Sequence, residues 1–175
     1  GVSTLAQFER LFTIGIEKVA VNAAAVGDMN LVTQAARVFG SQSIVVGIDV
    51  WRSLFGRYER HVRSATVGTK ETAVEAAVRA EAAGAGELML TSVDRDGTQQ
   101  GYDLTLVQEV ASAVKVPVIA CGGAGSTAHM AQIIKQGRAA SAAAGSLFVF
   151  QGKHRAVLIT YQDEKEIDAA LAALN

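Results

Sequence analysis

Three short apolar runs, each followed within a few residues by a carboxylate or a glycine cluster, limit the fold of this chain more than any other feature. They lie at residues 44–48, 88–90 and 118–120. A short continuous apolar run is typical of a strand that helices cover on both faces. The polar groups of such a sheet can meet a ligand only where the strands end. We therefore predict one site at the carboxyl ends of these strands.

Segments with helical periodicity and capping residues alternate with the apolar runs. The predicted helices begin after Thr4 and after Asp28, span residues 70–83, begin after Asp103 and after Ser126 or Thr127, and span residues 167–174. The predicted strands cover residues 18–22, 44–49, 88–92, 117–121 and 139–146. Residues 51–65 are too polar for a core and are predicted to form a loop or hairpin.

This regular alternation predicts parallel strands joined by crossover helices. Five strands fit either an open doubly wound sheet or part of an eight-stranded barrel. The glycine-rich ends of the last two strands favour the barrel, because barrel phosphate sites are built by the loops after strands seven and eight. We predict an α/β fold in which residues 1–175 form a single partial (β/α)8 TIM-barrel domain.

The 175 residues, half of them hydrophobic, suffice for one core, and the formal net charge of −1 gives no reason to expect a nucleic-acid partner. No apolar run approaches the roughly 20 residues that span a bilayer, and no signal peptide is recognisable, so we expect a cytoplasmic protein without a membrane partner. Cys121 is the only cysteine, and a small buried thiol is a better interpretation than a nucleophile. His61, His129 and His154 share no metal-ligand spacing, so each is interpreted as a surface or packing residue and no metal or cofactor is predicted.

The glycine-rich segment 122–125 leads directly into a predicted helix. Glycines let the backbone approach an anion, while the amides and the helix N-terminus favour its charge. Gly145 and Ser146 form a second such turn after the next strand. The alternative is a tight turn that needs positive φ. Because two clusters follow neighbouring strands, we predict phosphate binding.

Asp49 is the strongest candidate for moving a proton, because it follows an apolar strand and is partly removed from water. It could instead cap a helix or pair with Arg52. Asp96 and Gly97 could bind substrate hydroxyls or orient loop amides. Asn22, after its own strand, could donate to a phosphate or cap a turn.

Lys18 and Glu87 precede apolar runs and so lie at the opposite ends of their strands. Solvated surface charge is the simpler interpretation. In a barrel, however, the two side chains would face the bottom of the interior, where opposite charges could plug an axial passage.

Several longer stretches are together similar to one enzyme family. They are FGSQ with VVGID at 39–49, GAGELMLTS with DRDGT at 84–98, GYD at 101–103, and PVIA with GGAG at 117–125. The chain resembles, almost end to end, the cyclase subunit of imidazole glycerol phosphate synthase, a (β/α)8 barrel of histidine biosynthesis. By that resemblance it corresponds to about strands 4–8, with Gly1 as the last glycine after strand three.

The resemblance implies a lyase and cyclase that receives ammonia from a glutaminase partner. The ammonia reacts with a phosphorylated ribulosyl aminoimidazole carboxamide nucleotide to give imidazole glycerol phosphate and aminoimidazole carboxamide ribotide. Asp49 matches one of the family's two catalytic aspartates, and Lys18 and Glu87 match members of the charged gate that admits ammonia. The positions that match substrate and phosphate contacts are Gly1, Asn22, Thr91, Asp96, Gly97, Gly122, Gly123, Gly145 and Ser146.

Parts of the chain depart from the family pattern. The other catalytic aspartate lies on a first strand that has no counterpart here, so we expect these 175 residues alone to have negligible cyclase activity. Ala23 replaces a phosphate-binding threonine, and residues 66–73 do not align cleanly. Residues 54–58 and 148–161 resemble paralogues found with surface-polysaccharide genes, in which the barrel passes ammonia to an amidotransferase that makes acetamidino sugars. Three hypotheses stay open: a cyclase, an ammonia conduit, and a non-catalytic fragment that must associate to cover open sheet edges.

Overall fold

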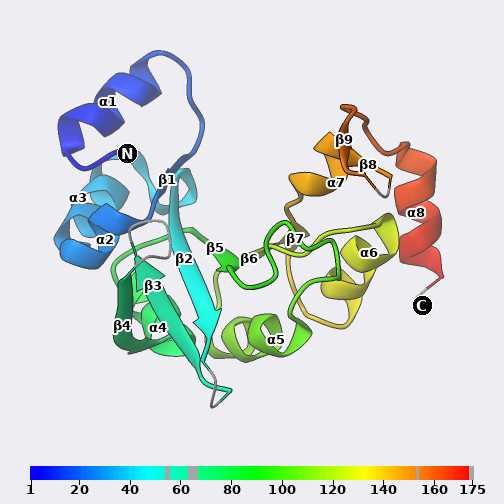
Figure 1. Ribbon diagram of the computed structural model, residues 1–175. Helices are drawn as coiled ribbons and strands as arrows, with labels where there is room; N and C mark the ends of the chain where they lie inside the picture. The colour runs from blue at the N-terminus through cyan, green and yellow to red at the C-terminus, as the bar shows by residue number, and fades with distance from the viewer. Residues whose placement is uncertain (54–55, 63–66, 153, 174–175) are drawn as a thin grey trace.

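The computed structural model describes residues 1–53, 56–62, 67–152 and 154–173. Within these ranges one sheet has the strand order β4-β3-β2-β5-β6-β7, with β1 also paired to β2, and two further strands form a small hairpin (Figure 1). The strands are β1 (Val19–Val21), β2 (Ile44–Arg52), β3 (Tyr58–Val62), β4 (Val67–Thr72), β5 (Glu87–Ser92), β6 (Val118–Cys121), β7 (Ser141–Ala142), β8 (Phe150–Gln151) and β9 (Ala156–Val157).

Helices connect the strands, and α3 to α6 pack against one face of the sheet. The helices are α1 (Leu5–Thr13), α2 (Ala23–Gly27), α3 (Met29–Phe39), the 3-10 helix η1 (Ser41–Ser43), α4 (Ala73–Ala82), α5 (Leu104–Ala113), α6 (Thr127–Lys135), α7 (Ser146–Val149) and α8 (Glu164–Ala172). No helix in the described ranges is long and apolar enough to cross a membrane.

The parallel part of the sheet confirms the predicted fold class. β1, β2, β5, β6 and β7 run parallel in this order, and helices form the crossovers between them. The path from β1 to β7 does not close on itself within the described residues. This arrangement is that of five consecutive strands of a (β/α)8 barrel.

The two faces of the sheet differ in burial with the two-residue period of a strand. On the outer face, which the helices cover, residues such as Ile48, Leu90 and Ala120 are fully or almost fully buried. Burial of one large aliphatic side chain of this kind stabilises a fold by about 1.5–3 kcal/mol. On the inner face, Asp49 and Thr91 are only half-buried. The inner face is therefore the accessible one.

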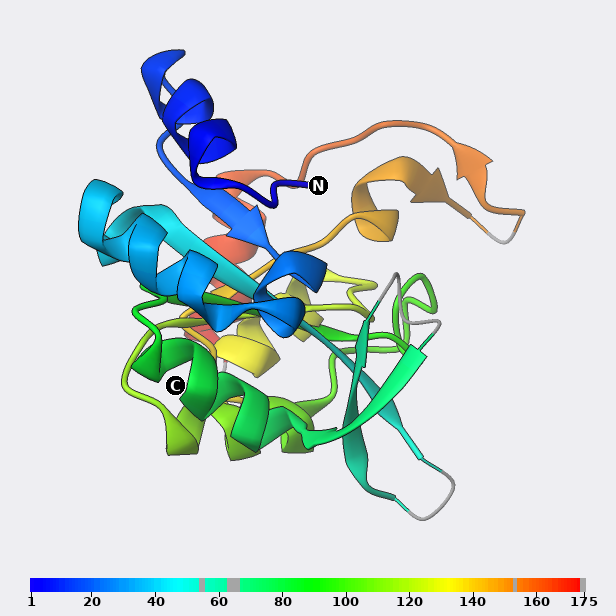
Figure 2. The same ribbon diagram turned by 90° about the vertical axis from the view of Figure 1, so that its left-hand side faces the viewer.

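An antiparallel hairpin extends the sheet beside the end of β2. β1 pairs only with the first residues of β2, and β3 takes the same edge from Asp49 to Arg52. The hairpin strands β3 and β4 lie beside the helical layer in Figure 2, and both contact α4. The predicted loop or hairpin after the strand is therefore a hairpin, although residues 54–55 and 63–66 lie outside the described ranges.

Several predicted boundaries were wrong. The helix predicted from residue 70 begins at Ala73, because residues 70–72 complete β4 and Thr72 caps the helix by accepting a hydrogen bond from Glu75 N. The strand predicted over 139–146 is limited to β7 and gives way to α7, in an alanine-rich stretch with weak β-propensity. The last helix is α8, which starts earlier than predicted because Asp163 caps it.

Other capping predictions were confirmed. The first helix begins after Thr4. Asp28 accepts from Asn30 N at 2.8 Å, and Ser126 rather than Thr127 caps α6 by accepting from His129 N at 3.2 Å. Such caps satisfy the first N–H groups of a helix.

A charged cluster fixes the hairpin to α4. The Arg60 side chain on β3 is fully buried and its Nη1 lies 3.1 Å from Glu71 Oε2. Arg79 on α4 donates to the two oxygens of Glu71 at 2.7 and 2.8 Å. Glu71 therefore joins a buried cation of the hairpin to the helix beneath it.

Candidate active site

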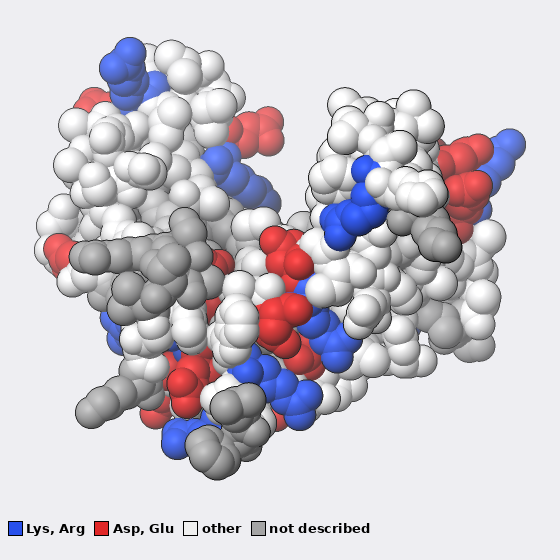
Figure 3. Space-filling view, in the orientation of Figure 1, with Lys and Arg blue, Asp and Glu red and all other residues white. Residues whose placement is uncertain are grey.

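Three polar side chains form a row across the inner face of the sheet. Asp49, Thr91 and Cys121 are register partners on the neighbouring parallel strands β2, β5 and β6. Register partners point to the same face, and neighbouring strands lie about 4.8 Å apart. Figure 3 shows a hollow between the α1–α3 end and the α7–β9 end of the molecule. The strands that carry the row lie between these two ends in Figure 1.

Asp49 does not lie at the strand end as predicted, because β2 continues to Arg52 where β3 pairs with it. Its position inside a strand excludes a helix-capping role. The guanidinium of Arg52 lies over the Tyr58 ring, 5.7 Å from its centroid.

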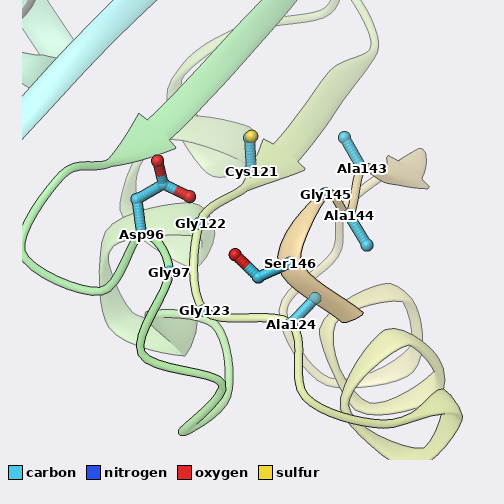
Figure 4. A pocket seen from close by; sticks show the side chains of 10 residues that line it. All are labelled: Asp96, Gly97, Cys121, Gly122, Gly123, Ala124, Ala143, Ala144, Gly145 and Ser146. Atoms are coloured by element: carbon cyan, nitrogen blue, oxygen red, sulfur yellow. The ribbon is translucent and has the colours of Figure 1, made fainter. Parts of the chain in front are cut away.

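A first pocket opens at the Cys121 end of the row. It brings together the predicted Asp96, both glycine clusters and Ser146, whose hydroxyl points toward the glycine loop after β6 (Figure 4). Its lining residues are Asp96, Gly97, Cys121, Gly122, Gly123, Ala124, Ala143, Ala144, Gly145 and Ser146.

Three backbone N–H groups among the lining residues of this pocket are available to a negatively charged ligand. In the described part of the chain, the N–H groups of Gly97, Gly123 and Ala124 have no hydrogen-bond acceptor. Gly125 does not contribute, because its N–H donates to His129 Nδ1 at 3.2 Å. Unpaired amides that converge on a hollow form an anion-binding nest.

The glycines of the first pocket are required for different reasons. Gly122 and Gly123 have φ of 91° and 101°. A Cβ there would collide with the carbonyl oxygens of Ser92 and Gly101, so close backbone packing alone explains both glycines. Gly145 has negative φ and nothing within 4 Å of a built Cβ. Its missing side chain leaves open space in the pocket.

A second pocket opens at the Asp49 end of the row. Its lining includes the predicted Gly1, Asn22 and Asp49. Asn22 follows β1 and precedes α2 but makes no side-chain cap hydrogen bond. Its Oδ1 is buried without a partner among the described residues, and such an acceptor costs about 1–3 kcal/mol unless a ligand supplies a donor.

The surroundings of Cys121 disfavour its thiolate form. Burial raises its pKa, and the charge of Asp96 and, more weakly, of Asp49 raises it further. A raised pKa disfavours the thiolate that a nucleophile needs. The prediction of an inert thiol at this strand end therefore agrees with the structure, although the residue is half-buried rather than fully buried.

A brace between the hairpin and the first pocket was missed by the sequence analysis. Tyr58 donates to the two carboxylate oxygens of Asp103 at 2.9 and 3.0 Å. Asp103 also caps α5 by accepting from Leu106 N, and Arg95 Nε lies 4.0 Å from it. Burial, together with the hydrogen bond to Asp103, raises the pKa of Tyr58 to about 12. The brace connects β3 to the loop that carries Asp96.

Lys18 and Glu87 meet at the amino ends of the strands. Lys18 Nζ lies 2.5 Å from Glu87 Oε1, although their strands are separated by β2. The two side chains are 50% and 21% exposed. The pair therefore crosses the inner face, as expected for charges at the bottom of a barrel.

Comparison with known proteins decides the family. The sequence profile of the family described as histidine biosynthesis protein matches residues 1–155. The chain belongs to this family. Relatives include subunit hisF2 of Pseudomonas aeruginosa, 46% identical over 168 residues, which are 96% of this chain and 67% of that protein. Subunit hisF3 of Vibrio vulnificus is 40% identical over 172 residues, 98% of this chain and 66% of that protein.

All three relatives compared with this chain carry the name of one enzyme, imidazole glycerol phosphate synthase. The third is subunit HisF of Alkaliphilus metalliredigens, 44% identical over 148 residues, which are 85% of this chain and 59% of that protein. The chain thus spans about two thirds, or less, of the length of these family members.

Proposed function

We propose that the protein performs the ammonia-dependent cyclase and lyase reaction of imidazole glycerol phosphate synthase in histidine biosynthesis. The observation that supports this most directly is the row of Asp49, Thr91 and Cys121, which has a pocket at each end. A substrate with two phosphates needs two anion sites and a proton-transfer group between or beside them.

In this proposal the first pocket holds one phosphate on the free amides of Gly123 and Ala124. The second pocket holds the other phosphate beside Gly1 and Asn22. Asp49 moves protons during ammonia addition and ring closure, because it is the carboxylate that lines the second pocket and can reach a substrate that joins the two.

The partner in this proposal is a glutaminase that supplies ammonia. The ion pair of Lys18 and Glu87 lies at the end of the strands opposite to both pockets. Ammonia that enters there would pass along the inner face toward Asp49. Opening of the ion pair would then be the gating step.

The test is a cyclase assay of the complete gene product with the ribulosyl nucleotide and an ammonium salt. Product formation is expected, and Asp49→Asn should reduce kcat by at least about 100-fold, the typical contribution of acid-base catalysis. Asp168→Asn, which changes an exposed carboxylate on α8, is the matched control. An Asp49→Asn enzyme with full activity would refute the assignment.

A second candidate, which comes from the resemblance of residues 54–58 and 148–161 to paralogues found with surface-polysaccharide genes, is an ammonia conduit for a sugar-modifying amidotransferase. The same assay separates the candidates. A complete gene product that binds a glutaminase but releases no imidazole product would favour the conduit.

A further inference from the structure

We propose that His61 is a second proton-transfer group of this active site and works as a pair with Asp49. This inference rests on the proposed function and adds to it a residue that the hairpin, rather than the parallel strands, brings to the site. The sequence analysis treated His61 as a surface or packing residue.

The strand register places the two side chains next to each other. β3 runs antiparallel to β2, and His61 is the register partner of Asp49. Residues directly opposite each other in an antiparallel pair have Cβ atoms about 4.5–5.5 Å apart on the same face of the sheet. An imidazole and a carboxylate at that spacing can contact the same ligand atom or each other.

One further observation places His61 on the inner face. The His61 and Trp51 ring centroids are 6.0 Å apart, and Trp51 shares the face of Asp49 because it lies two residues along β2. The imidazole extends toward β4, because a Cβ built on Gly68, its β4 partner, would lie 3.4 Å from His61 Nε2. Arg60, the preceding residue, is fully buried against Glu71 on the outer face.

His61 extends the polar row of the site by one strand. Across β3, β2, β5 and β6 the register partners are His61, Asp49, Thr91 and Cys121. β1 ends at Val21, opposite Val46, so the edge of β2 beside Asp49 is taken by β3. The hairpin thus supplies the group that stands beside the carboxylate.

The chemistry of the pair suits proton transfer in two directions. The His61 imidazole accepts a proton from the ammonia nitrogen as the new C–N bond to the substrate carbonyl carbon forms. It then donates this proton to the former carbonyl oxygen, which leaves as water when its C–O bond breaks, so the enzyme ends the cycle unchanged. Thr91 and the protonated Cys121 cannot replace it as a base near neutral pH.

The first experiment uses the complete gene product with the ribulosyl nucleotide and an ammonium salt. His61→Ala should lower kcat at least about 100-fold with little change in KM. Free imidazole should restore much of the loss in His61→Ala and none in Asp49→Asn. His154→Gln, in the exposed turn between β8 and β9, is the control and should match the wild type.

Several outcomes would overturn the inference. One is a His61→Ala enzyme with kcat near that of the wild type, and another is a loss that imidazole does not restore, since packing defects are not rescued by a base. If the wild type makes no product, the proposed function fails. The place of His61 in the site is then tested by a labelling experiment that does not depend on turnover. Diethyl pyrocarbonate labelling of the wild type, read by mass spectrometry, should be slowed at His61 but not at His154 by the nucleotide without ammonium. Equal labelling of His61 with and without the nucleotide would refute its place in the site.

Discussion

Replacement of Glu71 by alanine tests how the hairpin is held. The change would leave the Arg60 guanidinium, which is fully buried, without an anion. Nε and Nη2 of Arg60 already lack partners within the described residues. Removal of one partner from a buried ion pair costs about 3–5 kcal/mol. Because the Glu71 side chain is itself 21% exposed, water can replace part of the interaction, and we expect a loss of about 3 kcal/mol.

Urea unfolding at neutral pH measures this loss, and a double-mutant cycle isolates its cause. Arg60→Met replaces the buried cation by an apolar side chain of similar length and should be far less destabilising than Glu71→Ala. In the R60M background, Glu71→Ala should then cost no more than about 1 kcal/mol, the worth of the remaining exposed pair with Arg79. Equal losses in both backgrounds would show that the buried cation is not the cause, and the explanation would be wrong.

Four further results are expected. Burial would raise the pKa of Glu71, but hydrogen bonds from Arg79 and Arg60 outweigh it and lower the pKa. Its stabilisation is therefore complete above the unfolded value of about 4.3 and is lost as pH falls through the folded value, so urea midpoints of Glu71→Gln should fall less steeply with acidification than those of the wild type. Tyr58→Phe removes the hydrogen bonds to the carboxylate that caps α5 and should cost about 1.5 kcal/mol in urea unfolding. Gly122→Ala should destabilise the fold by about 1–3 kcal/mol, whereas Gly145→Ala should leave stability within about 0.5 kcal/mol and weaken nucleotide binding in calorimetry. The rate at which a thiolate-selective disulfide reagent labels Cys121 should still increase as the pH rises above about 8.5. An ordinary thiol has a pKa of about 8.5, and the pKa of Cys121 is raised.

The features that sequence predicted correctly depend on local signals. The alternation of buried and half-buried residues in β5 follows the strand period, and the Asp28 and Ser126 caps follow from hydroxyl and carboxylate chemistry at helix starts. The gathering of Asp49, Asp96 and the glycine clusters at one edge follows from parallel topology alone. The strand period, the capping residues and the topology of parallel strands were sufficient to predict these features.

The features that sequence missed depend on register or on distant pairs. Tyr58 and Asp103 are 45 residues apart in the chain and meet only because the hairpin folds against α5. No local signal marks this bond. The strand β4 was predicted as the start of a helix because the segment runs into an alanine- and glutamate-rich helix and its own sequence is polar. Hairpin pairing overrode that local preference.

The hairpin also links stability to the proposed chemistry through two consecutive residues. Side chains alternate along β3, so the period that buries Arg60 against Glu71 on the outer face is the same period that sets His61 beside Asp49 on the inner face. A slip of one residue would reverse both faces together, exposing the histidine position to α4 and turning the arginine toward the site. We therefore expect the buried cation to favour the register on which the His61–Asp49 pair depends, even where a buried ion pair adds little net stability. Arg60→Met should consequently leave the fold intact but loosen the register of the hairpin. Cyclase activity should then fall by a larger factor than the small loss in the free energy of unfolding would explain.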